Sequence, residues 1–212
     1  MSQNLIITIS RQYGSGGRET GVLLSKQMDI PMYDRELQTV AAARSGIDLK
    51  LLENVDETAS NSLLYTLVMK SGNNITDPST LPLSDKLFAA QSEIIREYAA
   101  QGSCIFVGRC ADFVLRNHPN VVKVFIHSEI NARINRIKRL HQVNAREAEA
   151  DIYKTDRRRA SYYNRNTQRR WGKAEYYDLS LSSSEIGVEG CAQMMADFVK
   201  IRKDFKMRRI DL

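Results

Sequence analysis

The chain has 212 residues, a net charge of +6 and 42% hydrophobic residues, which is typical of a soluble globular protein with one sizeable core. The positive charge favours an anionic partner such as a nucleotide, a nucleic acid or a phosphorylated metabolite. The three cysteines lack the spacing of a zinc site or a disulfide framework, and no apolar run is long enough to cross a membrane. We therefore expect a cytoplasmic, single-domain protein without membrane association.

The N-terminal region predicts a strand, a glycine-rich turn and a helix in direct succession. Residues 5–10 are β-branched and apolar, residues 11–18 contain three glycines, and residues 19–28 have a helical pattern. Such a turn directs backbone N–H groups and a helix N-terminus at one point, where a phosphate can bind. The alternative is a plain strand-to-helix turn that binds nothing.

This turn matches the phosphate-loop pattern G-x-x-x-x-G-K-[ST] only in part. Arg11 stands at the first glycine position, Gly16 matches the second, Gly17 occupies the lysine position, and Arg18 follows one residue late. Arg18 is long enough to replace the lysine and can form a fork with a phosphate. The residues of this segment that could surround a phosphate are Gly14, Ser15, Gly16, Gly17, Arg18 and Glu19.

Further along, residues 31–33 predict a short strand, and Asp34 is placed to cap a helix that ends near Ser45. Residues 47–83 alternate short apolar pieces with Ser, Asn, Gly and Pro, which predicts a mobile or inserted segment. The remaining predicted elements are helices at 84–101, 129–141, 145–164 and 188–203, and strands at 104–107, 121–126 and 178–182.

Strands that alternate with helices predict a parallel α/β sheet with helices on both faces. Ligands of such sheets bind at the carboxyl ends of the strands. The glycine turn, the pair Asp34-Arg35 and the pair Gly108-Arg109 each follow a predicted strand. We therefore expect arginines from three strand ends to converge on one crevice.

Residues 154–173 carry the densest positive charge, interleaved with tyrosines and a tryptophan. The segment could be a nucleic-acid surface, an arginine-bearing lid of a phosphotransferase, or a solvated basic helix face. Asp156 favours the lid, because a carboxylate can orient an arginine or hold a substrate group, whereas a phosphate-binding surface gains nothing from it.

Several motifs together resemble the cytidylate kinase-like family of P-loop nucleoside monophosphate kinases, along nearly the whole chain. The matching pieces are the strand and loop at 6–16, Gly108-Arg109-Cys110 for the family's G-R-D, the strand at 123–126, the pair Arg133 and Arg136, the D-R-x-R lid motif at 156–159 and the strand at 178–181. The resemblance implies a P-loop NTPase-type three-layer α/β fold with a five-stranded parallel sheet. It further implies a helical acceptor-binding insertion at 36–83 and an arginine-rich lid at 145–173.

The activity that the resemblance implies is transfer of the ATP γ-phosphoryl group to a nucleoside monophosphate, with CMP or dCMP the favoured acceptor and Mg²⁺ as cofactor. Arg133 would lie near the ATP. The other ATP-binding residues that the resemblance implies are those of the loop, namely Gly14, Ser15, Gly16, Gly17, Arg18 and Glu19. Asp34, Arg35 and Arg109 would hold the acceptor. The implied catalytic residues are Arg18, Asp156, Arg157 and Arg159, with Asp156 either contacting the acceptor or orienting a lid arginine.

The sequence also departs from the family pattern. The loop lysine is absent, and Ser10, Val107 and Cys110 occupy positions where bacterial cytidylate kinases have aspartates. The metal ligands and the oligomeric state therefore stay open. The alternatives are a catalytically weak or inactive nucleotide-binding protein with a regulatory role, a kinase of another small hydroxyl substrate, and, with less support, a nucleic-acid-binding protein.

Overall fold

The computed structural model describes residues 4–45 and 83–208, and it contains a sheet of five parallel strands in the order β2-β3-β1-β4-β5. The strands are β1 (Ile6–Arg11), β2 (Met32–Tyr33), β3 (Cys104–Val107), β4 (Val121–His127) and β5 (Leu179–Ser182). The prediction of a five-stranded parallel α/β sheet is confirmed.

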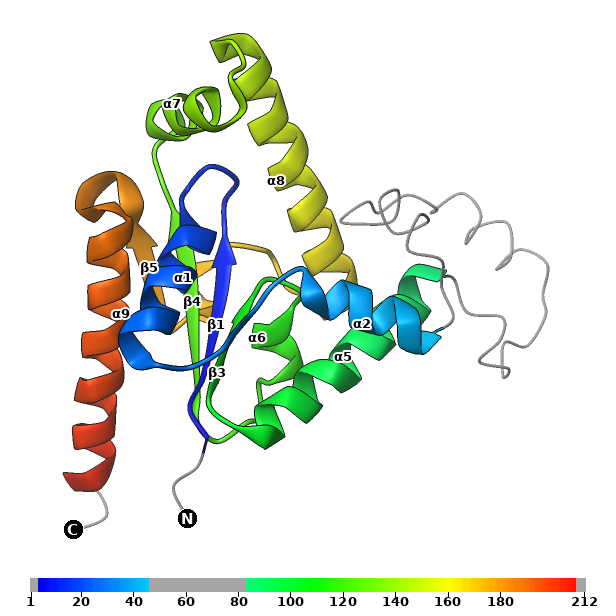
Figure 1. Ribbon diagram of the computed structural model, residues 1–212, viewed down its shortest axis with the longest axis vertical. Helices are drawn as coiled ribbons and strands as arrows, with labels where there is room; N and C mark the ends of the chain where they lie inside the picture. Colours follow the sequence, from blue (N-terminus) through cyan, green and yellow to red (C-terminus); the bar gives the residue numbers. More distant parts are fainter. Residues whose placement is uncertain (1–3, 46–82, 209–212) are drawn as a thin grey trace.

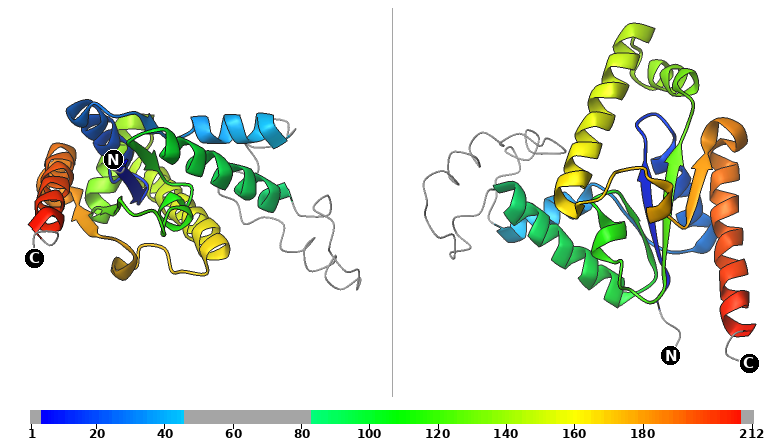
Figure 2. Two further views of the ribbon diagram at one scale, coloured as in Figure 1. Left: turned by 90° about the horizontal axis from the view of Figure 1, so that it is seen from below. Right: turned by 180° about the vertical axis from the view of Figure 1, so that it is seen from behind.

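Helices cover both faces of the sheet and thus make three layers (Figure 1). One face packs against α1 (Gly17–Met28) and α9 (Ser183–Arg208), and the other against α2 (Glu36–Ser45), α5 (Leu83–Gln101) and α6 (Ala111–Val114). Two further helices follow: α7 (Ile130–His141) lies beyond the carboxyl ends of the strands, and α8 (Ala145–Thr167) runs from there back toward α6 (Figure 1 and the right panel of Figure 2). A short 3-10 helix, Ala174–Tyr176, leads into β5.

The core has two parts because successive strand residues point to opposite faces. Ile7 and Ile9 of β1 pack with Leu24 of α1 and Met195 of α9, whereas Ile6 packs with the helices on the other face. Both faces of the sheet are covered, which explains why the inner strands β3 and β4 are mostly apolar, whereas the edge strand β5 alternates leucine and serine.

Several element boundaries differ from the expectations by one or more residues, among them those of β1, α8 and α9. Strand β1 continues to Arg11, which pairs with Ile126 of β4, so this arginine is the last strand residue and not the first loop residue. Helix α8 continues to Thr167. Helix α9 begins at Ser183 but is interrupted at Gly187 (φ 70°), so the predicted start at Val188 matches its second segment.

Part of the predicted insertion is α2, which packs against α5. Residues 46–82, which make up the rest of it, lie outside the described residues. Within 4–45 and 83–208, no helix has both the length and the apolar character required to span a bilayer.

Candidate functional site

A cleft of about 360 Å³ opens at the carboxyl ends of β1, β2 and β3, below α7 and α8. Arginines from all of these regions line it, namely Arg11, Arg18, Arg35, Arg109, Arg136 and Arg159. The acidic residues of its described lining are Glu19 and Asp34. The expected convergence of the three strand ends is therefore present, and the excess of guanidinium groups suits an anionic ligand.

The glycine loop between β1 and α1 forms the wall of the cleft next to α7. Gly14 and Gly16 have φ angles of 79° and 77°. A Cβ atom on Gly16 would lie 2.4 Å from Val188 Cγ1, and one on Gly14 would lie 3.2 Å from Arg133 Cβ. Since both positions require glycine, the loop can bring its backbone N–H groups and the N-terminus of α1 close to a phosphate.

Ser15 holds this loop against β4. Its hydroxyl donates hydrogen bonds to the carbonyl oxygens of Gln12 (2.9 Å) and Ile126 (3.2 Å), and its own carbonyl accepts one from Ser183 Oγ (2.6 Å). The side chain is completely buried and does not line the cleft. Ser15 was expected to bind ATP, but in the structure its hydroxyl holds the loop to β4.

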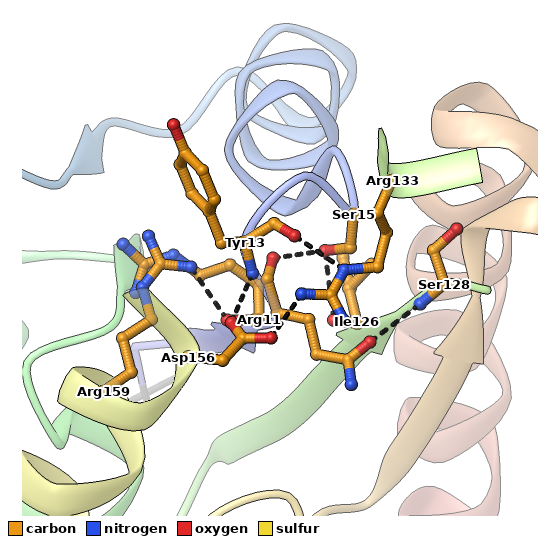
Figure 3. Close-up of polar contacts among 9 residues, drawn as sticks. Arg11, Tyr13, Ser15, Ile126, Ser128, Arg133, Asp156 and Arg159 are labelled. Atoms are coloured by element: carbon orange, nitrogen blue, oxygen red, sulfur yellow. Dashed lines mark hydrogen bonds and ion pairs between the residues drawn. The ribbon is translucent and has the colours of Figure 1, made fainter. Parts of the chain in front are cut away.

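Asp156 and Arg133 fix the tip of the loop, as Figure 3 shows. Asp156 Oδ1 accepts a hydrogen bond from the backbone N–H of Tyr13 (2.7 Å), and its other oxygen forms an ion pair with Arg133 Nη2. Arg133 Nε in turn donates to the carbonyl oxygen of Tyr13 (2.7 Å). Neither side chain lines the cleft, and together they join the loop to α7 and α8. Arg133 was expected near the ATP, and Asp156 was expected to contact the acceptor or to orient a lid arginine.

The two predicted lid arginines of α8 lie on different sides of the helix. Arg159 lines the cleft, donates a hydrogen bond to the carbonyl oxygen of Arg11 (3.1 Å), and lies over the Tyr13 ring (5.6 Å). Arg157 is exposed and is not part of the cleft lining. Residues 156 and 159 share a helix face because they are three positions apart, whereas residue 157 is turned away.

Arg109 has an unusual backbone. Gly108, Arg109 and Cys110 have φ angles of 78°, 58° and 56°, so three consecutive residues adopt the left-handed conformation at the end of β3. Non-glycine residues in this conformation cost about 1–3 kcal/mol each and cluster at functional sites. Arg109 is largely buried, and it lines both the cleft and a small recess beside it.

Arg18 reaches the same cleft as Arg109 and Arg159. Its Nε donates to Asp34 Oδ2 at 2.9 Å, with the arginine side chain 61% exposed and the aspartate 5% exposed. The carboxylate of Asp34, expected to cap α2, therefore pairs with α1. Arg18, Asp34 and Arg35 meet on the β2 side of the cleft.

The other carboxylate of the cleft is also paired, since Glu19 forms an ion pair with Arg136 of α7. Among the residues that the structure describes, no group of three or more His, Cys, Asp or Glu side chains could hold a metal ion. Magnesium in phosphoryl-transfer sites is usually held by one or two carboxylates together with substrate phosphates. Glu19, beside the glycine loop, is the carboxylate that fits this role.

A buried polar cluster lies where α6 and α8 meet. Tyr163 donates a hydrogen bond to Asp112 Oδ2 (2.6 Å), and burial raises the pKa values of both groups. Burial also raises the pKa of the neighbouring Tyr177 to about 12. The cluster anchors the second half of α8 to the end of β3.

Sequence reasoning assigned no role to two arginines of the cleft, Arg11 and Arg136. In the sequence, Arg11 is noted only as a mismatch at the first glycine position of the phosphate-loop pattern. The signal that could have identified it is its place as the last residue of a strand, where side chains reach the ligand edge of the sheet.

The parallel sheet with a glycine loop after its first strand, and an arginine-lined cleft above it, defines the fold of the P-loop kinases. Comparison with family models goes further: residues 6–185 match the cytidylate kinase-like family, and the chain belongs to that family. No curated protein sequence matches the chain.

Solved structures share the fold at low sequence identity. An uncharacterized protein from Eubacterium ventriosum has a TM-score of 0.70 and 23% identity, covering 92% of this chain and 98% of that one. Shikimate kinase from Bacteroides thetaiotaomicron has a TM-score of 0.50 and 13% identity, with coverage of 92% and 98%. A gluconokinase from Sinorhizobium meliloti has a TM-score of 0.51 and 12% identity, with coverage of 98% and 99%.

Proposed function

We propose that this protein is an ATP-dependent nucleoside monophosphate kinase, with CMP or dCMP as the favoured acceptor. The observation that carries the proposal is the single cleft in which a glycine loop and six arginines from separate elements meet. Family membership supports the kinase-like chemistry, and the acceptor follows from the resemblance to cytidylate kinases.

The cleft divides into two halves in this proposal. ATP enters as its magnesium complex and lies on the loop of Gly14, Gly16 and Gly17, beside Glu19. The acceptor phosphate lies on the β2–β3 side, against Arg35 and Arg109, with the Arg18–Asp34 pair next to it. The insertion at 36–83 would contribute to the acceptor side, and the segment at 145–173 would act as the lid.

The chemistry depends on position and charge. An oxygen of the acceptor phosphate forms a bond to the γ-phosphorus while the bond from that phosphorus to the β–γ bridging oxygen breaks, and the electron pair leaves with ADP. The acceptor phosphate is already ionised, so no general base is required. Charge spread over the transferred group is stabilised by guanidinium forks, for which Arg109 and Arg159 are the candidates.

The proposal is tested by ADP release in a coupled assay with CMP, dCMP and the other nucleoside monophosphates. We expect turnover with a pyrimidine acceptor, and a loss of at least about 100-fold in kcat/KM for Arg109→Ala. The matched control is Arg158→Ala, which removes an exposed arginine of α8 outside the cleft. A folded protein that binds ATP but phosphorylates no monophosphate would contradict the proposal.

A nucleotide-binding protein without turnover is the second candidate. It is favoured by Gly17 at the lysine position and by the two carboxylates of the cleft, each paired with an arginine. Phosphorylation of another small hydroxyl substrate is the third, since the structural neighbours include a shikimate kinase and a gluconokinase. Shikimate and gluconate therefore belong in the same acceptor panel.

A nucleic-acid-binding function has weaker support. The aromatic residues of 154–173 are engaged within the protein: Tyr163 is buried, and the ring of Trp171 packs edge-on against Phe125 at 5.4 Å. These side chains are not presented for stacking on bases. This candidate would be supported if oligonucleotide binding depended steeply on salt concentration and arginine substitutions in this segment weakened it by similar factors for all sequences.

A further inference from the structure

The side chain of Arg11 runs along the floor of the cleft. Its stem crosses Gly17, where an added Cβ would lie 2.5 Å from Arg11 Cβ and 2.9 Å from Arg11 Cγ. Its guanidinium ends at Gly108, where an added Cβ would lie 2.3 Å from Arg11 Nη1. Arg11 therefore extends from the N-terminus of α1 to the end of β3, between the glycine loop and Arg109.

The backbone does not explain why residue 17 is glycine. Gly14 and Gly16 have positive φ angles, but Gly17 does not, because it is the first residue of α1. Glycine is a poor helix residue, and alanine would suit this backbone better. What excludes a side chain at position 17 is the stem of Arg11, with which its Cβ would collide.

Position 17 is also where the phosphate-loop pattern has its lysine, whose ammonium group reaches the β- and γ-phosphates. A lysine there would have its Cβ in the space that the Arg11 stem fills. Where the pattern has glycine and lysine, this chain has arginine at position 11 and glycine at position 17. Arg18, the other candidate for the lysine role, is paired with Asp34 and is 61% exposed.

We propose that Arg11 supplies the positive charge that a loop lysine supplies elsewhere, by binding the terminal phosphates of ATP, and that Gly17 leaves room for it. The inference rests on the proposed function for the position of ATP on the glycine loop. A guanidinium offers a planar fork to two phosphate oxygens, which an ammonium cannot do. Arg159 holds the residue in place through its hydrogen bond to the Arg11 carbonyl oxygen (3.1 Å).

The test compares four variants of the full chain, namely Arg11→Met, Arg18→Ala, Gly17→Lys and the double exchange Arg11→Gly with Gly17→Lys. Calorimetry measures the Kd values of ATP and AMP for each, and thermal unfolding confirms that each is folded. Arg158→Ala, on the exposed side of α8, is the matched control.

We expect Arg11→Met to raise the Kd of ATP at least about tenfold, because the lost contact is to the terminal phosphates. The Kd of AMP should change less than twofold. Arg18→Ala should weaken ATP binding less than Arg11→Met does. Gly17→Lys alone should weaken ATP binding, because the new side chain collides with Arg11. The double exchange should bind ATP at least about tenfold more tightly than Gly17→Lys does, because it removes the collision and places a cation at the lysine position.

The outcomes separate this inference from the proposed function. Normal ATP affinity and turnover in Arg11→Met, or a larger loss in Arg18→Ala, overturns the inference and leaves the kinase function standing. Selective loss of ATP affinity in Arg11→Met, with no turnover by the unmodified chain, supports the inference and overturns the kinase function. No binding of ATP by the unmodified chain overturns both.

Discussion

The contacts of Asp156 predict how strongly α8 is held to the glycine loop. Replacing Asp156 with alanine removes the hydrogen-bond acceptor of the Tyr13 N–H and the ion-pair partner of Arg133. The Arg133 side chain is only 6% exposed, so water can replace the lost carboxylate only in part. The substitution therefore leaves a guanidinium buried without its counter-charge.

The size of the effect follows from this burial. Removing one partner of a buried ion pair costs about 3–5 kcal/mol, and the 17% exposure of Asp156 argues for the lower end, about 3 kcal/mol. For a chain of 150–250 residues, 1 kcal/mol corresponds to about 2–4 °C in Tm, which gives a decrease of about 6–12 °C. Asp156→Asn should lose less, because the amide oxygen can still accept from the Tyr13 N–H.

Urea unfolding followed by circular dichroism measures the free energy of unfolding of both variants. The matched control is Asp85→Ala, which breaks another arginine–aspartate ion pair of α8 (Arg165 Nη2 to Asp85 Oδ1, 2.7 Å) with side chains 35% and 32% exposed. Water screens this pair, and its loss should cost no more than about 1 kcal/mol. The reasoning is refuted if Asp156→Ala loses less than the Asp85 control.

Three further predictions concern Arg109, Asp112 and the buried thiols. In urea unfolding, Arg109→Gly should be more stable than Arg109→Ala by about 1 kcal/mol, because glycine tolerates φ 58°. Equal stability of the two variants would show that the backbone at residue 109 is not strained. Burial raises the pKa of Asp112, so this carboxyl contributes a downward slope to the dependence of stability on pH above about 3.9. Asp112→Asn should abolish this slope in urea titrations, and an unchanged slope would exclude Asp112 as its source. Burial raises the pKa values of Cys104 and Cys191 to about 12 and 11, so neither should react with a thiol reagent at pH 8 until the protein unfolds.

The layers of the fold were predictable from the sequence because they follow from local patterns. Short apolar runs such as residues 104–107 are buried on both faces of the sheet, and helical periodicity marks the elements between them. The convergence of Arg35 and Arg109 on one cleft follows from a general rule for parallel sheets. These features depend on chain order and strand direction only.

The roles of single polar side chains were not predictable in the same way, because they depend on tertiary contacts. Ser15, Arg133 and Asp156 lie in motifs that indicate ligand binding, yet their side chains form hydrogen bonds with the backbone of the loop. The path of Arg11 depends on β1 continuing one residue beyond its apolar run and on α1 starting with glycine. No single-sequence pattern contains that information.

The most direct test of the kinase assignment is transfer of the γ-phosphoryl group of ATP to CMP, followed by ³¹P NMR. The spectrum follows the loss of the CMP monophosphate resonance and of the ATP β-phosphate resonance without the appearance of inorganic phosphate, and so distinguishes transfer from simple ATP hydrolysis. We predict stoichiometric formation of CDP and ADP, lost in Arg109→Ala and retained in Arg158→Ala. Folded protein that binds ATP and yields no phosphorylated product from any nucleoside monophosphate would contradict the assignment.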